Sequence, residues 1–235
     1  MPDIDEITFD NVIPFGKMQN LEIEDLKNGI SRFGGYRKPN YFMAYFRSAE
    51  ILIDNGVQNN TLDEIGIPAF YIQRHALELL LKRVISSLYE VAELRLHLNN
   101  EGYRPSKGQV HRVTNEHKLE SLLSDLKVTC EGMKFISPPN ELEKLVEHIN
   151  KFEKSSVTWA RYENSKNIEH VKEEILLPII DLQKQLELVK LKIAFQSGSI
   201  EVENAVHFIE KETYENEIYN EWKFTFLSIE DPGRT

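Results

Sequence analysis

A short stretch near the middle of the chain gathers side chains that could bind phosphate. From Arg104 to Lys118, the sequence RPSKGQVHRVTNEHK has Arg, Lys or His at six of fifteen positions. These residues are Arg104, Lys107, His111, Arg112, His117 and Lys118. Clustered cations of this kind are the footprint of a phosphate-binding or RNA-binding surface. The alternative is a solvated loop in which His117 packs against the next helix or caps it.

A second group of polar residues interrupts an otherwise apolar segment, FYIQRHALELLLKR. Arg74, Glu78 and Lys82 recur every four residues, and His75 adjoins them. Residues at this spacing lie on one face of a helix, where opposite charges can pair. The stripe predicts either an ion-pair ladder along a solvated edge or an internal network that positions the helices or lines a site.

Metal and nucleophile chemistry have little support in the sequence. His170 with Glu173 or Glu174 has helical spacing, but the chain lacks an HExxH motif and a cysteine ligand set. The one cysteine, Cys130, is next to Glu131, which does not favour a reactive thiolate. The chain also lacks a P-loop and a GxGxxG motif. We therefore expect no metal and no cofactor, and an enzyme of this sequence would work with His, Arg and carboxylates.

The composition is that of a globular protein with a negative charge. The 235 residues include 28 Lys and Arg against 38 Asp and Glu, a net charge of −10. This balance argues against a protein that coats nucleic acid indiscriminately, because phosphate binding depends on Lys and Arg. The cations gather at 104–118 and 32–38, which leaves room for a local site.

The compartment follows from the cysteine count and the chain start. One cysteine excludes an intramolecular disulfide. The opening MPDIDEITFD lacks the basic and apolar regions of a signal peptide, and no apolar run approaches 18 residues. We expect a cytoplasmic protein with no membrane association.

Apolar periodicity near 3.6 predicts about five helices. They cover 40–54, 68–96, a third segment capped by Thr114 or Asn115, a fourth that starts at Pro138-Pro139, and 167–195 with a bend at Pro178. Beyond Gly198 the period changes to two, which predicts a β-hairpin. The predicted fold is mainly α: an N-terminal extension with a short strand (1–39), a helical bundle (40–197) and a C-terminal β-hairpin extension (198–235).

Three short motifs resemble the HEPN (higher eukaryotes and prokaryotes nucleotide-binding) superfamily of helical domains. The matching positions are Arg74, His75, Glu78, Leu79 and Lys82, then His117, Leu119, Leu122 and Leu123, and finally the pair Arg161-Tyr162. The resemblance covers about residues 40 to 195. It implies an up-and-down bundle of four or five helices that commonly forms a homodimer.

The catalytic branch of this superfamily implies a metal-independent ribonuclease with an Arg-x(4–6)-His motif. In that chemistry the RNA 2′-hydroxyl attacks its own phosphate. An imidazole transfers the proton, and a guanidinium neutralises the charge that builds on phosphorus. In the family the two copies of the motif meet across the dimer axis, so a dimer would be part of the mechanism.

The chain offers more than one candidate for this motif. Arg112 and His117 are separated by four residues, and Arg104 and His111 by six, as the motif requires. Arg161 and His170 are separated by eight residues, outside the window. They could still meet if a helix beginning near residue 167 placed His170 in its first turn, where a phosphate is favoured. The alternative is a surface histidine and a loop arginine.

Two functions are compatible with these patterns. The first is an RNA-directed HEPN-like protein, a metal-independent endoribonuclease of toxin or phage-defence type. It would work as a homodimer with Arg161 and His170, or Arg112 and His117, in its cleft. An antitoxin or another protein would be its partner. The second is a non-catalytic HEPN-like module that dimerises through the bundle and holds a protein partner on the exposed edge of the hairpin.

Overall fold

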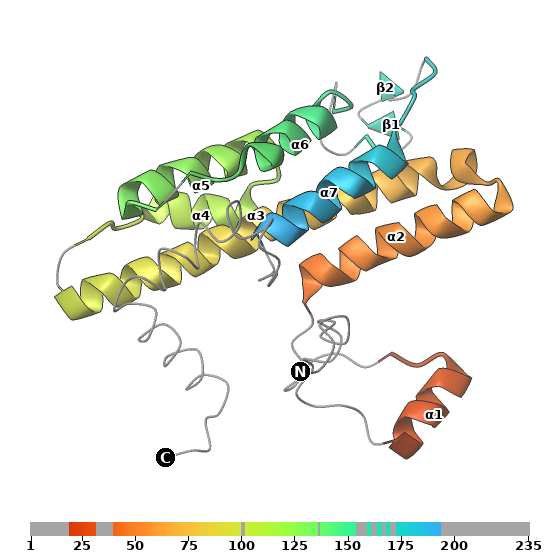
Figure 1. Cartoon of the computed structure of the whole chain (residues 1–235), viewed down its shortest axis with the longest axis horizontal. Coiled ribbons are helices and arrows are strands. Elements are labelled where there is room, and N and C mark those ends of the chain that lie inside the picture. The colour runs from red at the N-terminus through yellow and green to blue at the C-terminus, as the bar shows by residue number, and fades with distance from the viewer. Residues whose placement is uncertain are drawn as a thin grey trace, which may run out of the picture.

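The computed structural model describes residues 19–31, 40–99, 102–135, 137–153, 159–160, 164–165, 168–169 and 173–193. Within these ranges the chain is mainly helical, which confirms the predicted class (Figure 1). The elements in order are α1 (Gln19–Asn28), α2 (Tyr41–Asn59), α3 (Leu62–Asn99), α4 (Lys107–Asn115), α5 (Leu119–Met133), α6 (Asn140–Asn150), β1 (Asn164–Ser165), β2 (Ile168–Glu169) and α7 (Ile179–Ile193). Over the same ranges, no helix has the length and apolar character needed to cross a membrane.

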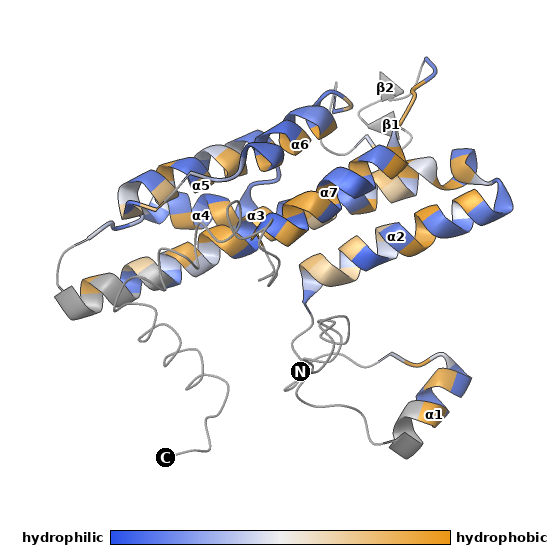
Figure 2. Cartoon of the chain, viewed as in Figure 1, coloured by the Kyte–Doolittle hydropathy of each residue, from blue (hydrophilic) through white to orange (hydrophobic). Residues whose placement is uncertain are grey.

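Helix α3 forms the centre of the bundle. It is buried on several sides, and α2, α4, α5 and α7 all contact it. The fully buried side chains along it include Phe70, Leu77, Leu80, Leu81, Ile85 and Leu88. Its neighbours show alternating hydrophobic and hydrophilic residues, as amphipathic helices do when one side packs on a core (Figure 2). Polar groups on the sides of α3 that face these helices are therefore enclosed, whereas Arg83 and Glu90 on its outer side are exposed.

Two predicted helix boundaries were wrong because Gly and Pro lie inside helices. Helix α2 continues past Asp54 to Asn59, with Gly56 inside it. Gly56 lets α3 approach closely, because a Cβ there would lie 2.9 Å from Ile65 Cγ1. Asn60 then ends the helix in the left-handed conformation at φ 56°. The second helix was predicted to begin at Pro68. Helix α3 begins six residues earlier, at Leu62, and carries Pro68 inside it.

The segment before α5 contains a helix that the sequence did not predict. Helix α4 begins with a capping box, in which Gln109 N–H donates to Ser106 Oγ at 3.2 Å and Ser106 N–H donates to Gln109 Oε1 at 2.8 Å. Thr114 and Asn115 lie in α4, so neither caps α5, whose N-cap is Lys118. Helix α6 follows Pro139, as predicted.

Helix α7 begins much later than the predicted fifth helix. It starts at Ile179, directly after Pro178, and its first backbone bond runs from Leu182 N–H to the Pro178 carbonyl at 2.9 Å. Proline disfavours helical geometry in the residue before it, so a helix starts after it more readily than it crosses it. Upstream, β1 pairs antiparallel with β2. The single helix predicted from residue 167 to 195 is therefore wrong, and with it the premise that would have placed His170 in a first turn.

Several predictions concern residues outside the described ranges. These are the N-terminal strand, the hairpin at 198–235, the basic segment 32–38, Arg161 and His170. Within the segment predicted as an N-terminal extension, α1 is described and lies apart from the bundle (Figure 1).

Candidate functional site

The carboxylate of Glu78 is the centre of a charged cluster on α3. Its side chain is 3% exposed. Lys82 Nζ and His117 Nδ1 each lie 2.9 Å from Glu78 Oε1, and Arg74 Nη1 donates to Oε2. His75 Nδ1 lies 3.9 Å from Oε2, too far for a hydrogen bond but close enough for an electrostatic contact. One buried anion thus faces two cations and two imidazoles.

Arg74 connects this cluster to two other parts of the fold. Its Nε donates to Glu153 Oε1 at 2.5 Å, just after α6, and its Nη2 donates to the backbone carbonyl of His117. Lys82 Nζ also donates to the Thr114 carbonyl at the end of α4, at 3.3 Å. Arg74 and Glu78 are buried, so they do not lie on a solvated edge. The contacts fix the connection between α4 and α5 against α3.

Glu78 is ionised at neutral pH. Burial alone would raise the pKa of this carboxyl, but the interactions with His75, Lys82 and His117, together with the charge of Arg74, outweigh burial. The result is a pKa far below its ordinary value of 4.5. An ionised carboxylate can only accept hydrogen bonds, which makes the His117 nitrogen facing it a donor.

His117 is held at one ring nitrogen and open elsewhere. Its side chain is 66% exposed, although Nδ1 faces the buried Glu78. It does not cap α5, because the N-cap residue is Lys118. With the proton on Nδ1, Nε2 carries the lone pair and can accept a proton or, once protonated, release one. The arrangement therefore suits acid–base chemistry at the surface.

The Arg112 side chain hydrogen-bonds a different carboxylate from the one that the His117 ring contacts. Its guanidinium forms a fork with Asp125 on α5, with Nε 3.1 Å from Oδ2 and Nη2 2.8 Å from Oδ1. These hydrogen bonds and the charge of Asp125 raise the pKa of Arg112. The two residues that the sequence paired thus contact different carboxylates, and Arg112 holds α4 on α5.

The remaining cations of this stretch are exposed. Arg104, Lys107, His111 and Lys118, here called the α4 cationic surface, lie on α4 or beside its ends. Among the described residues, none of their side chains forms an ion pair, but the backbone N–H and the charge of Lys118 lower the pKa of the neighbouring Glu116 carboxyl. Arg104, Lys107 and His111 are thus the most available to anions from solution.

Tyr103 positions the start of α4. Its ring covers Gly132 on α5, where a Cβ would lie 2.3 Å from Tyr103 Cδ2. Gln109 Nε2 donates to the Tyr103 hydroxyl at 2.7 Å, and Gln109 is also a member of the capping box. The α4 cationic surface is therefore attached to a rigid helix rather than to a free loop.

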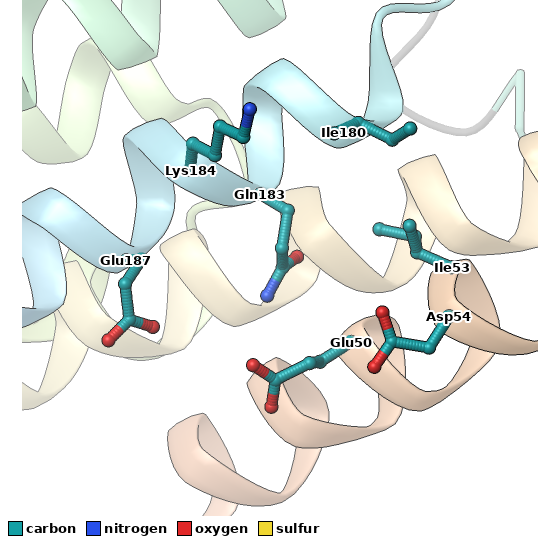
Figure 3. A pocket seen from close by; sticks show the side chains of 7 residues that line it. All are labelled: Glu50, Ile53, Asp54, Ile180, Gln183, Lys184 and Glu187. Carbon is teal, nitrogen blue, oxygen red and sulfur yellow. The ribbon is translucent and has the colours of Figure 1, made fainter. Parts of the chain in front are cut away.

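A pocket of about 310 Å³ lies on a different part of the bundle, between α2 and α7 (Figure 3). The residues that line it are Glu50, Ile53, Asp54, Ile180, Gln183, Lys184 and Glu187. In Figure 3 the amine of Lys184 points away from the carboxylates of α2. Three carboxylates against one amine would repel phosphate, so this pocket is no candidate for RNA.

Comparison of the chain with protein-family models, with curated proteins and with solved structures found no match. The site therefore has to be interpreted from its own geometry.

Sequence reasoning missed two acidic residues of the site. Glu153 is 79 residues from Arg74, and Asp125 is 13 residues from Arg112. Their partners come from other helices, so no periodic pattern connects them. Arg161 and His170, the other predicted catalytic pair, lie outside the described residues.

Proposed function

We propose that this chain is an RNA-binding protein of HEPN-like type and that the α4 cationic surface is its RNA interface. The supporting observation is the contrast between its cations. Arg74, Lys82 and Arg112 bind carboxylates, whereas Arg104, Lys107 and His111 are exposed and form no ion pair among the described residues. Lys118 is also exposed, although its charge acts on the neighbouring Glu116. The first group fixes the structure, and the second is available to phosphate.

Exposed cations bind phosphate at little cost in desolvation, and the gain comes largely from released counterions. A surface on a fixed helix also loses little conformational entropy on binding. Affinity should fall as salt increases, because the contacts are made by exposed charges that salt screens. The homodimer implied by the resemblance would place two such surfaces in one particle, which a mass measurement in solution would test.

The test compares two double variants of equal charge. Lys107→Gln/Lys118→Gln removes two cations from the α4 cationic surface. Lys144→Gln/Lys151→Gln removes two exposed cations on or just after α6. Affinity for a labelled, unstructured single-stranded RNA is measured by fluorescence anisotropy in EDTA over a salt series.

We expect the first variant to bind more weakly and its slope of log affinity against log salt to be smaller by about 1.4, at about 0.7 per phosphate contact on a single strand. The second variant should bind like the wild type. Equal losses of affinity in both variants would mean that net charge, not the α4 cationic surface, determines binding, and this would overturn the proposal. An absence of RNA binding by the wild type would also overturn it.

A further inference from the structure

The pocket between α2 and α7, here called the α2–α7 pocket, contains two carboxylates that lack a cation partner. Glu50 and Asp54 are four residues apart on α2, so they lie on the same face of this helix, and both are exposed. Neither side chain forms an ion pair or a hydrogen bond within the described residues. The third carboxylate, Glu187 on α7, is already bound to Lys190, with Oε2 2.6 Å from Nζ. The available negative charge of the pocket therefore comes from α2.

Two isoleucines give the same pocket an apolar part. Ile53 on α2 is buried, and Ile180 on α7 is 42% exposed. Figure 3 shows Ile180 on the opposite helix from Ile53, with the α2 carboxylates on one side of them. A long side chain with methylene groups and a charged end can pack its stem on the isoleucines while the charged end reaches Glu50 and Asp54.

The amide of Gln183 adds a hydrogen-bond donor. Gln73 Nε2 on α3 donates to the Ile179 carbonyl at 2.7 Å and to Gln183 Oε1 at 3.0 Å. Because a carbonyl can only accept, these two bonds fix the oxygen of Gln183 toward Gln73. In Figure 3 the Gln183 side chain extends from α7 toward α2. Its Nε2 is buried and has no acceptor within the described residues. An acceptor brought into the pocket would remove the cost of this unpaired donor.

We propose that the α2–α7 pocket binds an arginine side chain of a protein partner. Glu50 and Asp54 bind the guanidinium, whose planar fork has donors for two carboxylates, and Gln183 Nε2 donates to a backbone carbonyl of the same segment. Charge complementarity selects a basic residue, and the unpaired donor selects a peptide over a free amine, because an ammonium group has no acceptor. The volume of about 310 Å³ is enough for one long side chain with its backbone.

The experiment titrates the full chain, labelled with ¹⁵N, with the blocked tripeptide acetyl-Leu-Arg-Leu-amide and follows the amide signals by NMR. We expect the signals of residues 50–54 and 180–187 to shift, together with the side-chain NH₂ signals of Gln183. The tripeptide with citrulline in place of arginine keeps the shape and loses the charge, and butylguanidinium keeps the charge and lacks a carbonyl. Each of these two ligands should bind about 10-fold more weakly than the arginine peptide.

Two double variants of equal charge test the carboxylates. Glu50→Gln/Asp54→Asn should weaken binding of the arginine peptide about 10-fold. Glu90→Gln/Glu93→Gln removes the same charge from exposed positions on α3 and should bind like the wild type.

The proposal is overturned if the arginine peptide causes no shifts in the pocket at millimolar concentration, or if the citrulline peptide binds equally well. Equal losses in the two double variants would attribute binding to net charge and would also overturn it. Equal affinity for butylguanidinium would identify a site for small cations in place of a protein partner. RNA binding by the α4 cationic surface is a separate measurement, so either proposal can fail alone.

Discussion

At the scale of single residues, the fold depends on one buried anion. Glu78 balances Arg74 and Lys82, and all three follow from an i, i+4 spacing that the sequence displays. The sequence did not indicate how deeply they are buried, because burial depends on the helices that surround α3. It also did not connect Glu78 with His117, which is 39 residues away.

The first prediction concerns the loss of this anion. Glu78→Gln leaves the buried Arg74 and the half-buried Lys82 facing a neutral amide, so we expect a loss of about 3–5 kcal/mol in the free energy of unfolding at pH 7. Glu90→Gln, an exposed position on the same helix, should change it by less than about 0.5 kcal/mol. Urea denaturation measures both, and similar small changes in the two variants would contradict the network.

The same carboxylate gives an expected pH dependence. Because its pKa in the folded state is lowered, its contribution to stability is complete above the ordinary carboxyl pKa of 4.5 and is lost as pH falls towards the folded-state value. The stability difference between the wild type and Glu78→Gln should therefore be constant from pH 7 to 5.5 and shrink below about 4.5. A difference that grows in acid would contradict the assignment.

At the scale of elements, the helices with apolar periodicity were the predictable ones. Helices α2, α3 and α6 were predicted, apart from the end of α2 and the start of α3, because each carries a regular apolar face. Helix α4 was not, since Val113 is its one buried residue and its other valine, Val110, is exposed. The start of α7 was missed because apolar residues before Pro178 continue the pattern into a segment that is not helical.

A prediction at this scale concerns the contact that fixes α4. Gly132→Ala would place a methyl group inside the Tyr103 ring, so we expect a loss of about 1–3 kcal/mol in unfolding free energy and weaker RNA binding. Gly108→Ala is the control, because the nearest atom to its Cβ would be Ser106 Oγ at 3.8 Å. Because alanine favours a helix over glycine, Gly108→Ala should raise the free energy of unfolding by roughly 0.5–1 kcal/mol. Thermal unfolding and anisotropy report both effects, and a neutral Gly132→Ala would contradict the positioning role of Tyr103.

At the scale of the whole molecule, paired cations, acidic residues and exposed cations lie in different parts of the fold. The cations of the Glu78 cluster are neutralised by buried carboxylates, and the α2–α7 pocket is acidic. The α4 cationic surface is exposed and lies outside both. A chain with a net charge of −10 can thus offer a polyanion a local cationic surface.

The most direct test of the RNA interface is ultraviolet crosslinking of the full chain to single-stranded RNA, with the crosslinked peptides identified by mass spectrometry. The α4 cationic surface predicts crosslinks within residues 103–118, where Tyr103, His111 and His117 offer reactive rings, and their loss as salt increases. Crosslinks confined to other parts of the chain, such as the helices around the α2–α7 pocket, would contradict it.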